Sequence, residues 1–323
     1  PEIAAMQRTA KALAALDCLT GLSRAALKDR YVRPQITNSR EGRISIHDGR
    51  HPMVEHALKR EMFVPNDTEL NHTDQEMIII TGPNMAGKST YMRQVAVLTI
   101  MAQTGSFIPA KSASFAPVDR IFTRVGAADD ISTGQSTFMV EMKEVSHILC
   151  NATKNSLILL DEIGRGTSTY DGMSIARAVV EYLNAKVHAY TLFATHYHEL
   201  SDMAAENEHI KNYTVTVKER GKEITFLRRI VPGSADKSYG IHVARLAGLP
   251  ESLLKRADEI LEGLEVEGIK EEPAAPVIRR ETALNLFSSP IIDELADLDV
   301  MSKTPIEAME ILFRLSKEAK EGH

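Results

Sequence analysis

The sequence has few cysteines and no long apolar run. Its two cysteines, Cys18 and Cys150, are far apart, and neither belongs to a CxxC pair. Isolated thiols of this kind are typical of reduced structural cysteines in cytosolic proteins, so a disulfide framework is not expected. No apolar run approaches the roughly 20 residues of a membrane-spanning helix, and no secretory signal is visible. We therefore expect a cytosolic location.

The chain also lacks an excess of positive charge. Its formal net charge is −6, so it has no basic footprint that would indicate nucleic-acid binding by the chain as a whole. From Glu262 onward it has 14 acidic and 7 basic residues, a net charge of −7, which leaves +1 for the rest. The length of 323 residues predicts one large domain or two to three smaller ones. The start at Pro1, already in helical register, suggests a fragment of a longer protein.

Strand and helix patterns alternate through the middle of the chain. Fully apolar runs predict buried strands, and apolar residues at helical spacing predict helices. The expected strands are 43–47, 77–80, 120–125, 157–160, 190–195 and a hairpin of 213–217 with 223–227. The expected helices are 2–17, 90–102, 136–150 and 174–184, and residues 65–75 are expected to be a loop. This alternation predicts an α/β fold with a mainly parallel sheet.

The last quarter of the chain has a different pattern. Residues 240–264 hold two short helical patterns split by the sequence AGLP, a spacing that suits a helix-turn-helix. Most such patterns are helical corners, so DNA binding by this segment is the minor alternative. Residues 265–280 are charged and contain two prolines, which predicts a linker, and helical periodicity resumes over 290–318.

Residues 82–89, with the sequence GPNMAGKS, match the phosphate-loop pattern of glycine, four residues, glycine, lysine and serine. The loop follows the apolar run 77–80 and precedes a helical pattern, which is the context that phosphate loops need. Glycines let backbone N–H groups and the positive end of a helix face an anion. In this pattern Lys88 reaches the β- and γ-phosphates, and the hydroxyl of Ser89 binds Mg²⁺.

An acidic pair, Asp161 and Glu162, follows the apolar strand 157–160. Such a pair at a strand end is the second half of many nucleotide sites. Asp161 can hold Mg²⁺ there, and Glu162 can orient and polarise an attacking water. Successive residues at a strand end can point to different parts of one site.

Two weaker signals surround the acidic pair. His196 follows the strand 190–195, where it can hydrogen-bond a γ-phosphate. His198 and Glu199 come next, but no further metal ligands cluster near them, so zinc is not expected. Residues 132–137 (STGQST) precede a helix, and a serine- and glycine-rich helix start is another anion site.

Together these motifs resemble the bacterial MutS family of DNA mismatch repair ATPases. The resemblance rests on GRHP at 49–52, TGPNMAGKSTYMR at 81–93, GQSTFMVEM at 134–142, LDEIGRGTSTYDG at 160–172, FATHYHEL at 193–200 and KSYGIHVA at 237–244. It covers about residues 1–264 and, more weakly, 290–320, and it corresponds to the C-terminal part of the family. The uninterrupted TGPNMAGKST is more specific than the generic phosphate loop.

The resemblance implies a P-loop NTPase domain of the ABC-ATPase type that works as a head-to-tail pair. Each ATP is then held between the phosphate loop of one copy and the signature segment of the other. The implied nucleotide-binding residues are Gly82, Pro83, Asn84, Met85, Ala86, Gly87, Lys88, Ser89, Thr90 and the adenine-stacking Phe63. The implied metal ligands are Ser89 and Asp161, and the implied catalytic residues are Lys88, Glu162, the switch histidine His196 and Ser136, which acts in trans. A second adenine-facing position falls near Arg228, whose flat guanidinium can stack on a base.

The resemblance also divides the chain into segments. Residues 1–33 correspond to the end of a lever helix, 34–238 to the ATPase domain, 239–264 to a dimer-clasping helix-turn-helix, 265–289 to a linker and 290–323 to a small helical oligomerisation element. The family's mismatch-reading, connector and clamp domains have no counterpart in the chain, so weak or no mismatch specificity is expected.

The resemblance implies cofactors and partners as well. The cofactors are ATP or ADP and Mg²⁺. The partners are a second copy in a homodimer, with a tetramer through the C-terminal element, mismatched DNA through the missing domains, and a MutL-type repair protein. The implied location is the bacterial cytosol or nucleoid.

Three other interpretations share parts of this pattern. An ABC nucleotide-binding domain of a transporter has the same chemistry, but the LSGGQ-type signature is absent and GRGTSTYDG follows the acidic pair. The MutS branch that acts outside mismatch repair typically ends in a nuclease-type module, whereas this chain ends in a short helical pattern. In a non-catalytic assembly module, nucleotide would only lock a dimer, and measured phosphate release distinguishes this case.

Overall fold

The computed structural model describes residues 2–38, 42–58, 62–83, 86–126, 136–220, 223–234, 239–268 and 314. The chain divides into two units, residues 1–259 and 260–323, and nearly all described residues belong to the first. Several predicted features therefore lie outside the described residues. They are Asn84 and Met85 of the phosphate loop, signature residues 132–135, most of the linker, and the C-terminal element apart from Arg314.

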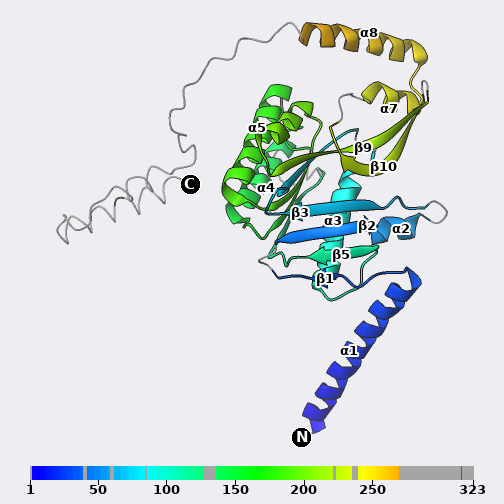
Figure 1. Ribbon diagram of the computed structural model, residues 1–323, viewed down its shortest axis with the longest axis vertical. Coiled ribbons are helices and arrows are strands. Elements are labelled where there is room, and N and C mark those ends of the chain that lie inside the picture. The colour runs from blue at the N-terminus through cyan, green and yellow to red at the C-terminus, as the bar shows by residue number, and fades with distance from the viewer. Residues whose placement is uncertain are drawn as a thin grey trace. The chain divides into compact units, whose positions relative to one another are not determined.

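A six-stranded sheet organises the first unit (Figure 1). Its strands are β4 (Met77–Thr81), β6 (Ile121–Arg124), β7 (Leu157–Asp161), β8 (Tyr190–Ala194), β9 (Ile210–Arg220) and β10 (Glu223–Pro232), in the order β10-β9-β4-β8-β7-β6. All neighbours are parallel except β10, which pairs antiparallel with β9. The predicted α/β fold with a mainly parallel sheet is confirmed. The strand order places β8 between β4 and β7, so the carboxyl ends of these three strands are neighbours.

Both faces of the central strands β4, β7 and β8 are buried. Helix α3 (Lys88–Gln103) covers one face, and α4 (Thr137–Asn151) and α5 (Thr169–Tyr182) cover the other (Figure 1). Ile78 and Ile80 of β4 pack into the core that contains α3, whereas Met77 and Ile79 pack into the core that contains α4 and α5. Because side chains alternate across a strand, a strand buried on both faces is a continuous apolar run. This explains why β4, β7 and β8 are recognisable in the sequence.

A second sheet lies on the far side of α3 (Figure 1), and of its strands the sequence predicted only the one at 43–47. Its strands are β1 (Gln35–Ile36), β5 (Ser112–Phe115), β2 (Arg43–Gly49) and β3 (Asn66–Asn71), in the order β1-β5-β2-β3. Ile44, Ile46, Leu70 and Phe115 of this sheet are fully buried in the same core as α3. Helix α3 is therefore held between two sheets.

The predicted loop over residues 65–75 is wrong, because its first half forms β3. The inward-facing residues Asn66, Thr68 and Leu70 are 4 %, 2 % and 0 % exposed. Two of these three are polar, so the alternation gives no apolar signal. Thr68 donates from its hydroxyl to the Tyr91 hydroxyl of α3 at 3.0 Å, which satisfies one of these buried polar groups.

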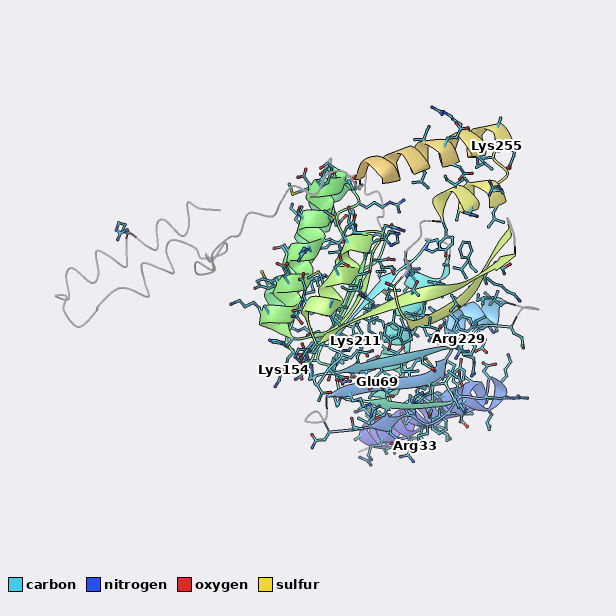
Figure 2. All side chains as sticks on the ribbon, turned by 45° about the horizontal axis from the view of Figure 1, so that its top comes forward. Arg33, Glu69, Lys154, Lys211, Arg229 and Lys255 are labelled. Carbon is cyan, nitrogen blue, oxygen red and sulfur yellow. The ribbon has the colours of Figure 1, made fainter. Side chains whose placement is uncertain are left out.

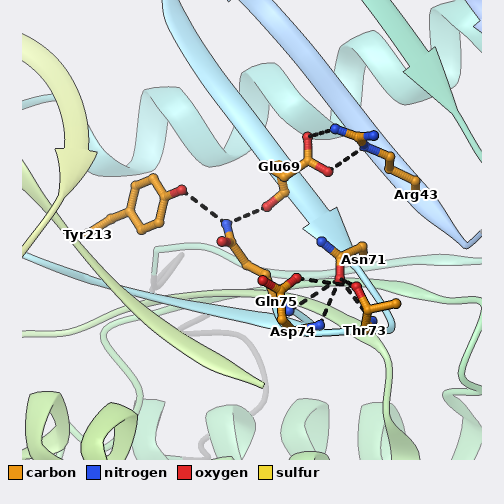
Figure 3. Close-up of polar contacts among 7 residues, drawn as sticks. All are labelled: Arg43, Glu69, Asn71, Thr73, Asp74, Gln75 and Tyr213. Carbon is orange, nitrogen blue, oxygen red and sulfur yellow. Dashed lines mark hydrogen bonds and ion pairs between the residues drawn. The ribbon is translucent and has the colours of Figure 1, made fainter. Parts of the chain in front are cut away.

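The turn after β3 connects the two sheets (Figure 3). The Oδ1 atom of Asn71 accepts the backbone N–H groups of residues 73–75 at 2.8, 2.9 and 3.3 Å. This fixes the turn that carries Gln75, whose Nε2 donates to the Glu69 carbonyl at 2.6 Å and to the Tyr213 hydroxyl of β9 at 3.0 Å. The side chain of Gln75 thus bridges β3 and the six-stranded sheet.

The remaining helices are mostly short. They are α1 (Glu2–Lys28), α2 (Pro52–Ala57), the π-helical turn η3 (Leu183–Val187), the 3-10 turn η4 (His198–Asp202), α6 (Met203–Glu206), α7 (Gly240–Leu246) and α8 (Glu251–Gly268). Helix α1 continues past its predicted end at residue 17, and the described chain buries none of its residues. Helices α7 and α8 flank 247–250 as predicted, while their role in dimerisation stays a prediction.

The surface of the described chain is charged. The side chains of Arg33, Lys154 and Arg229, for example, are exposed (Figure 2). Within the described ranges, none of the helices combines the length and the apolar character that crossing a membrane requires.

We expect the substitution Ile79→Ala to lower the free energy of unfolding by about 2–5 kcal/mol, because it leaves a cavity at a fully buried position of a central strand. Urea denaturation followed by circular dichroism measures the change. Ile3→Ala is the matched control, because the same side chain is 73 % exposed in α1. Equal effects of the two substitutions would contradict this description of the core.

Candidate nucleotide-binding site

The loop after β4 contains two glycines with positive φ angles. Gly82 has a φ of +122° and Gly87 a φ of +104°, both in the region that residues with a Cβ atom rarely adopt. Gly87 is the residue before helix α3, which begins at Lys88. The first N–H groups of α3 therefore lie at the carboxyl end of β4, where they form a site for an anion.

Lys88 lies inside this loop. Its side chain is 1 % exposed, and its ammonium group donates a hydrogen bond to the carbonyl of Gly82. Burial lowers the pKa of Lys88 to about 8, and the negative charges of Glu162 and Asp161 oppose the shift. At neutral pH the loop therefore carries a positive charge that is poorly solvated and that an anion would stabilise.

Asp161, at the end of β7, is 8 % exposed, and its Oδ1 atom has no hydrogen-bond partner among the residues that the structure describes. Burial raises the pKa of this carboxyl group, while a hydrogen bond with the Ser89 side chain lowers it. An unpartnered buried carboxylate oxygen beside a hydroxyl fits a divalent cation. No cluster of three acidic, histidine or cysteine ligands occurs among the residues described, so Mg²⁺ would take its other ligands from phosphates and water.

Glu162 is held by the next strand and by two side chains. Its φ is +57°, a strained value for a residue with a side chain, and its N–H donates to the Ala194 carbonyl of β8 at 2.9 Å. The Nε2 atom of His196 lies 2.6 Å from Oε1, and the guanidinium of Arg165 contacts Oε2. The hydrogen bonds from His196 and then Arg165 lower the pKa of Glu162 to about 2.

The structure thus brings together the side chains of Lys88, Asp161, Glu162 and His196, which the sequence predicted from separate segments. Arg165 is an addition that sequence reasoning did not include. Its only sequence signal is its place three residues after Glu162, in the GRG segment. It supplies a cation to the acidic pair from outside the phosphate loop.

A cavity of about 430 Å³ opens beside the acidic pair. Its lining comes from the phosphate-loop helix, from the end of β6, from α4 and from the acidic turn, and it includes Ser89, Arg93, Arg124, Asp161, Glu162 and Arg165. Three arginines and three carboxylates, those of Glu141, Asp161 and Glu162, therefore face one space, which suits a polyphosphate that also carries a cation. Arg93 and Arg124 were not predicted to belong to the site.

Ser136 lies at the N-terminus of α4, where its side chain accepts the N–H of Met139 at 3.2 Å. The hydroxyl therefore caps its own helix. The preceding residues 127–135 lie outside the described part of the chain. A role of Ser136 on the phosphate of a second copy stays a prediction.

Phe63 lines a second cavity, of about 180 Å³, on the other side of the phosphate loop. Gly87, Thr90, Tyr91, Gln94 and Arg228 also line it. The cavity therefore places an aromatic ring and a guanidinium beside the loop, as a site for a nucleobase requires.

Arg228 reaches this cavity from an irregular part of β10. Its φ is +54°, and the pairing of β10 with β9 shifts register between Phe226 and Ile230. The buried Asn66 side chain holds this bulge, because it donates to the Arg228 carbonyl at 3.1 Å and accepts the Ile230 N–H at 2.7 Å. Sequence reasoning did not include Asn66, because its partners lie more than 160 residues away.

A larger cavity, of about 770 Å³, lies apart from these residues. It is lined by residues 33–37, Ala102 and residues 105–107, with Arg33 as its one charged side chain among the described residues. It contains none of the predicted site residues, so its size alone does not make it the functional site.

The chain is similar to known proteins over most of its length. Residues 78–265 match the family model of MutS domain V. Proteins named DNA mismatch repair protein MutS are 51 % identical in Acetivibrio thermocellus, 52 % in Methanococcoides burtonii and 54 % in Caldicellulosiruptor bescii. The matches cover 99 %, 98 % and 98 % of this chain but 38 % of each relative. The chain thus spans less than two fifths of the length of these relatives.

The burial of Lys88 predicts a pH dependence of stability. The pKa of Lys88 is about 8 in the folded chain, and an unfolded lysine has a pKa of roughly 10.4. Between these values the unfolded chain binds more protons, so the cost of burying Lys88 falls as the pH rises. We expect Lys88→Met to be more stable than the wild type at pH 7.5, and this advantage to shrink by about 2 kcal/mol at pH 9.5.

Urea denaturation of both proteins at the two pH values tests this dependence. Taking the difference between variant and wild type removes the contribution of tyrosines and of other groups that titrate near pH 10. An advantage that stays constant from pH 7.5 to 9.5 would show that Lys88 has an ordinary pKa.

Proposed function

We propose that this chain, which belongs to the MutS family, is the ATP-binding and ATP-hydrolysing part of a DNA mismatch repair protein. One observation carries the proposal. The neighbouring strands β4, β8 and β7 bring the phosphate loop, His196 and the acidic pair to one edge of the sheet. Ligands of open α/β sheets bind at this edge, beyond the carboxyl ends of the strands. We assign the domain to the P-loop NTPases of the ABC type.

In this proposal the chain binds Mg-ATP across the phosphate loop. Lys88 and the backbone N–H groups of the non-proline residues of 82–90 would hold the phosphates, and Lys88 would exchange its contact with the Gly82 carbonyl for a phosphate oxygen. Ser89 and Asp161 would hold Mg²⁺, which neutralises the developing charge on the phosphates. Phe63 and Arg228 would stack on the two faces of adenine.

Glu162 and His196 would act on the attacking water. With a pKa of about 2, Glu162 is a weak base, so its first role is to accept a hydrogen bond and orient the water. His196 and Arg165 each contact one of its carboxylate oxygens. An ionised carboxylate has about four acceptor positions, so Glu162 can also accept a hydrogen bond from a water while these contacts remain. His196 would contact the γ-phosphate if it exchanged its contact with Glu162 for a phosphate oxygen.

The proposal includes a homodimer with composite sites. Ser136 of one copy would face the γ-phosphate bound by the other, and residues 239–264 would clasp the two copies. Residues 290–323 would promote a tetramer. Because the matched relatives are much longer, we assign the reading of mismatched DNA to their remaining parts. A MutL-type partner and a location in the bacterial cytosol or nucleoid belong to the same proposal.

We expect Glu162→Gln to keep ATP binding and to lower kcat on the order of 10²-fold or more, because it removes the carboxylate that orients the water. Lys88→Ala should instead weaken ATP binding, because it removes the buried cation. Calorimetry measures binding, and a phosphate-release assay measures turnover. Glu181→Gln is the matched control, because this exposed glutamate of α5 pairs only with Arg177 among the described residues.

Normal turnover by Glu162→Gln would remove Glu162 from the catalytic role. Unchanged ATP affinity of Lys88→Ala would overturn the whole site assignment. If the wild-type chain binds ATP without measurable phosphate release, the chain is an assembly module rather than an enzyme.

A mixture of Lys88→Ala and Ser136→Ala chains tests the composite site. A mixed dimer has one site with both defects and one site with none. An equal mixture should therefore regain about a quarter of the wild-type sites if copies exchange freely. Phosphate release is measured for each variant alone and for the mixture. A mixture no more active than its components would show that Ser136 does not act in trans.

A further inference from the structure

Gly164, two residues after Glu162, has close contacts or hydrogen bonds with three other residues, Gly172, Glu141 and Tyr197. Its φ is +88°, and a Cβ atom built on it would lie 2.4 Å from the Gly172 carbonyl oxygen of α5. Its N–H donates to Oε1 of Glu141 at 2.6 Å. Its carbonyl accepts the Tyr197 hydroxyl at 3.1 Å. Three elements thus hold the backbone turn that carries Glu162.

Glu141 reaches Gly164 from the second turn of α4. It is 5 % exposed, and its other oxygen, Oε2, lies 3.4 Å from Nη2 of Arg124. Arg124, at the end of β6, is 7 % exposed and donates from Nη1 to the Gly126 carbonyl at 2.5 Å. The buried carboxylate therefore has both a compensating cation and a hydrogen-bond donor, which fixes its position.

Ser136 and Glu141 lie close together at the N-terminal end of helix α4. Ser136 caps its first turn, and Glu141 lies five residues later on the same helix. The cavity beside the acidic pair is lined both by Thr137 and Glu141 of α4 and by Asp161 and Glu162. A displacement of the helix start therefore moves Glu141, and through Glu141 the N–H of Gly164.

We propose that Glu141 is a positioning residue that ties α4 to the turn carrying Glu162. The inference rests on the proposed function, in which the start of α4 faces nucleotide bound by a second copy. Occupation of that second site would then shift α4 and, through the hydrogen bond between Glu141 and Gly164, adjust Glu162 of the first site. The two sites of a dimer would be coupled through one carboxylate. Glu141 contacts no reacting atom in this scheme.

Glu141→Ala and Glu144→Ala form a matched pair for the test. Glu144 also pairs with Arg124, at 3.0 Å, but its side chain is 50 % exposed, and it makes no described hydrogen bond to the Gly164 turn. Both substitutions remove an acidic partner of Arg124, and only Glu141→Ala removes the acceptor of the Gly164 N–H. Glu141→Gln keeps an oxygen acceptor at nearly the same position. Tyr197→Phe removes the opposite contact of Gly164.

The first measurement is hydrogen–deuterium exchange at the Gly164 amide in the full chain. We expect faster exchange in Glu141→Ala, near wild-type exchange in Glu144→Ala, and an intermediate rate in Glu141→Gln. The second measurement is steady-state ATPase kinetics. Glu141→Ala should lower kcat about 10- to 100-fold, as a displaced catalytic group does, while ATP affinity stays within about twofold because the phosphate loop is untouched.

Several outcomes would overturn the proposal. Equal exchange rates of the Gly164 amide in Glu141→Ala and Glu144→Ala would show that Glu141 does not hold the Gly164 turn. Faster exchange without a loss of kcat would show that the tie does not position Glu162. If Glu141→Ala does not fold, Glu141→Gln and Tyr197→Phe take its place in both measurements.

The test separates this inference from the proposed function. Unchanged ATP affinity of Lys88→Ala overturns the function, whatever Glu141 does. If the wild-type chain shows no turnover, the position of Glu162 is read from the imidazole NMR signals of His196, which lies 2.6 Å from Glu162. The chemical shifts of those signals should differ from the wild type in Glu141→Ala and equal the wild type in Glu144→Ala. Equal shifts in the wild type and both variants would overturn the inference.

Discussion

Burial of both faces of the strands β4, β7 and β8 confines polar chemistry to the ends of these strands. Met77–Thr81, Leu157–Asp161 and Tyr190–Ala194 are buried along their whole length. Charged groups therefore occur first at the last residue of a strand, as Asp161 does, or directly after it. Because β8 lies between β4 and β7, these places are adjacent. The phosphate loop, the acidic pair and His196 therefore lie side by side at one edge of the sheet.

Burial at this edge of the sheet destabilises the charged forms of Lys88 and Asp161. Lys88 and Asp161 are nearly inaccessible to water, and burial shifts their pKa values in opposite directions, each toward the neutral form. The pKa of Glu162 is instead shifted toward the charged form, because His196 and Arg165 stabilise its carboxylate. A bound polyphosphate would place negative charge beside Lys88, and its cation would place positive charge beside Asp161. Buried charges of this kind lower the stability of the fold, but they favour the binding of a ligand of opposite charge.

Sequence reasoning reached the parts of this architecture that depend on local pattern. The continuous apolar runs identified β4, β7 and β8, and the glycine spacing identified the loop before Lys88. Of the second sheet only β2 was predicted, and β3 was missed because the polar residues Asn66 and Thr68 occupy its buried positions. Asn66, Arg165 and Glu141 could not be found, since their roles come from backbone groups and strands that only the folded chain brings near them.

The contact between Gly164 and Gly172 bears on how natural sequence variants of this chain are interpreted. A Cβ atom on Gly172 would lie 2.1 Å from the Gly164 carbonyl oxygen, so neither glycine can change alone. Gly172 belongs to the first turn of α5 and has no polar side chain, which would place it among neutral helix positions in a survey of substitutions. Any replacement there pushes on the turn that carries Glu162. A replacement of Gly172 is therefore expected to disturb the candidate site through the backbone, even though no polar side chain is lost.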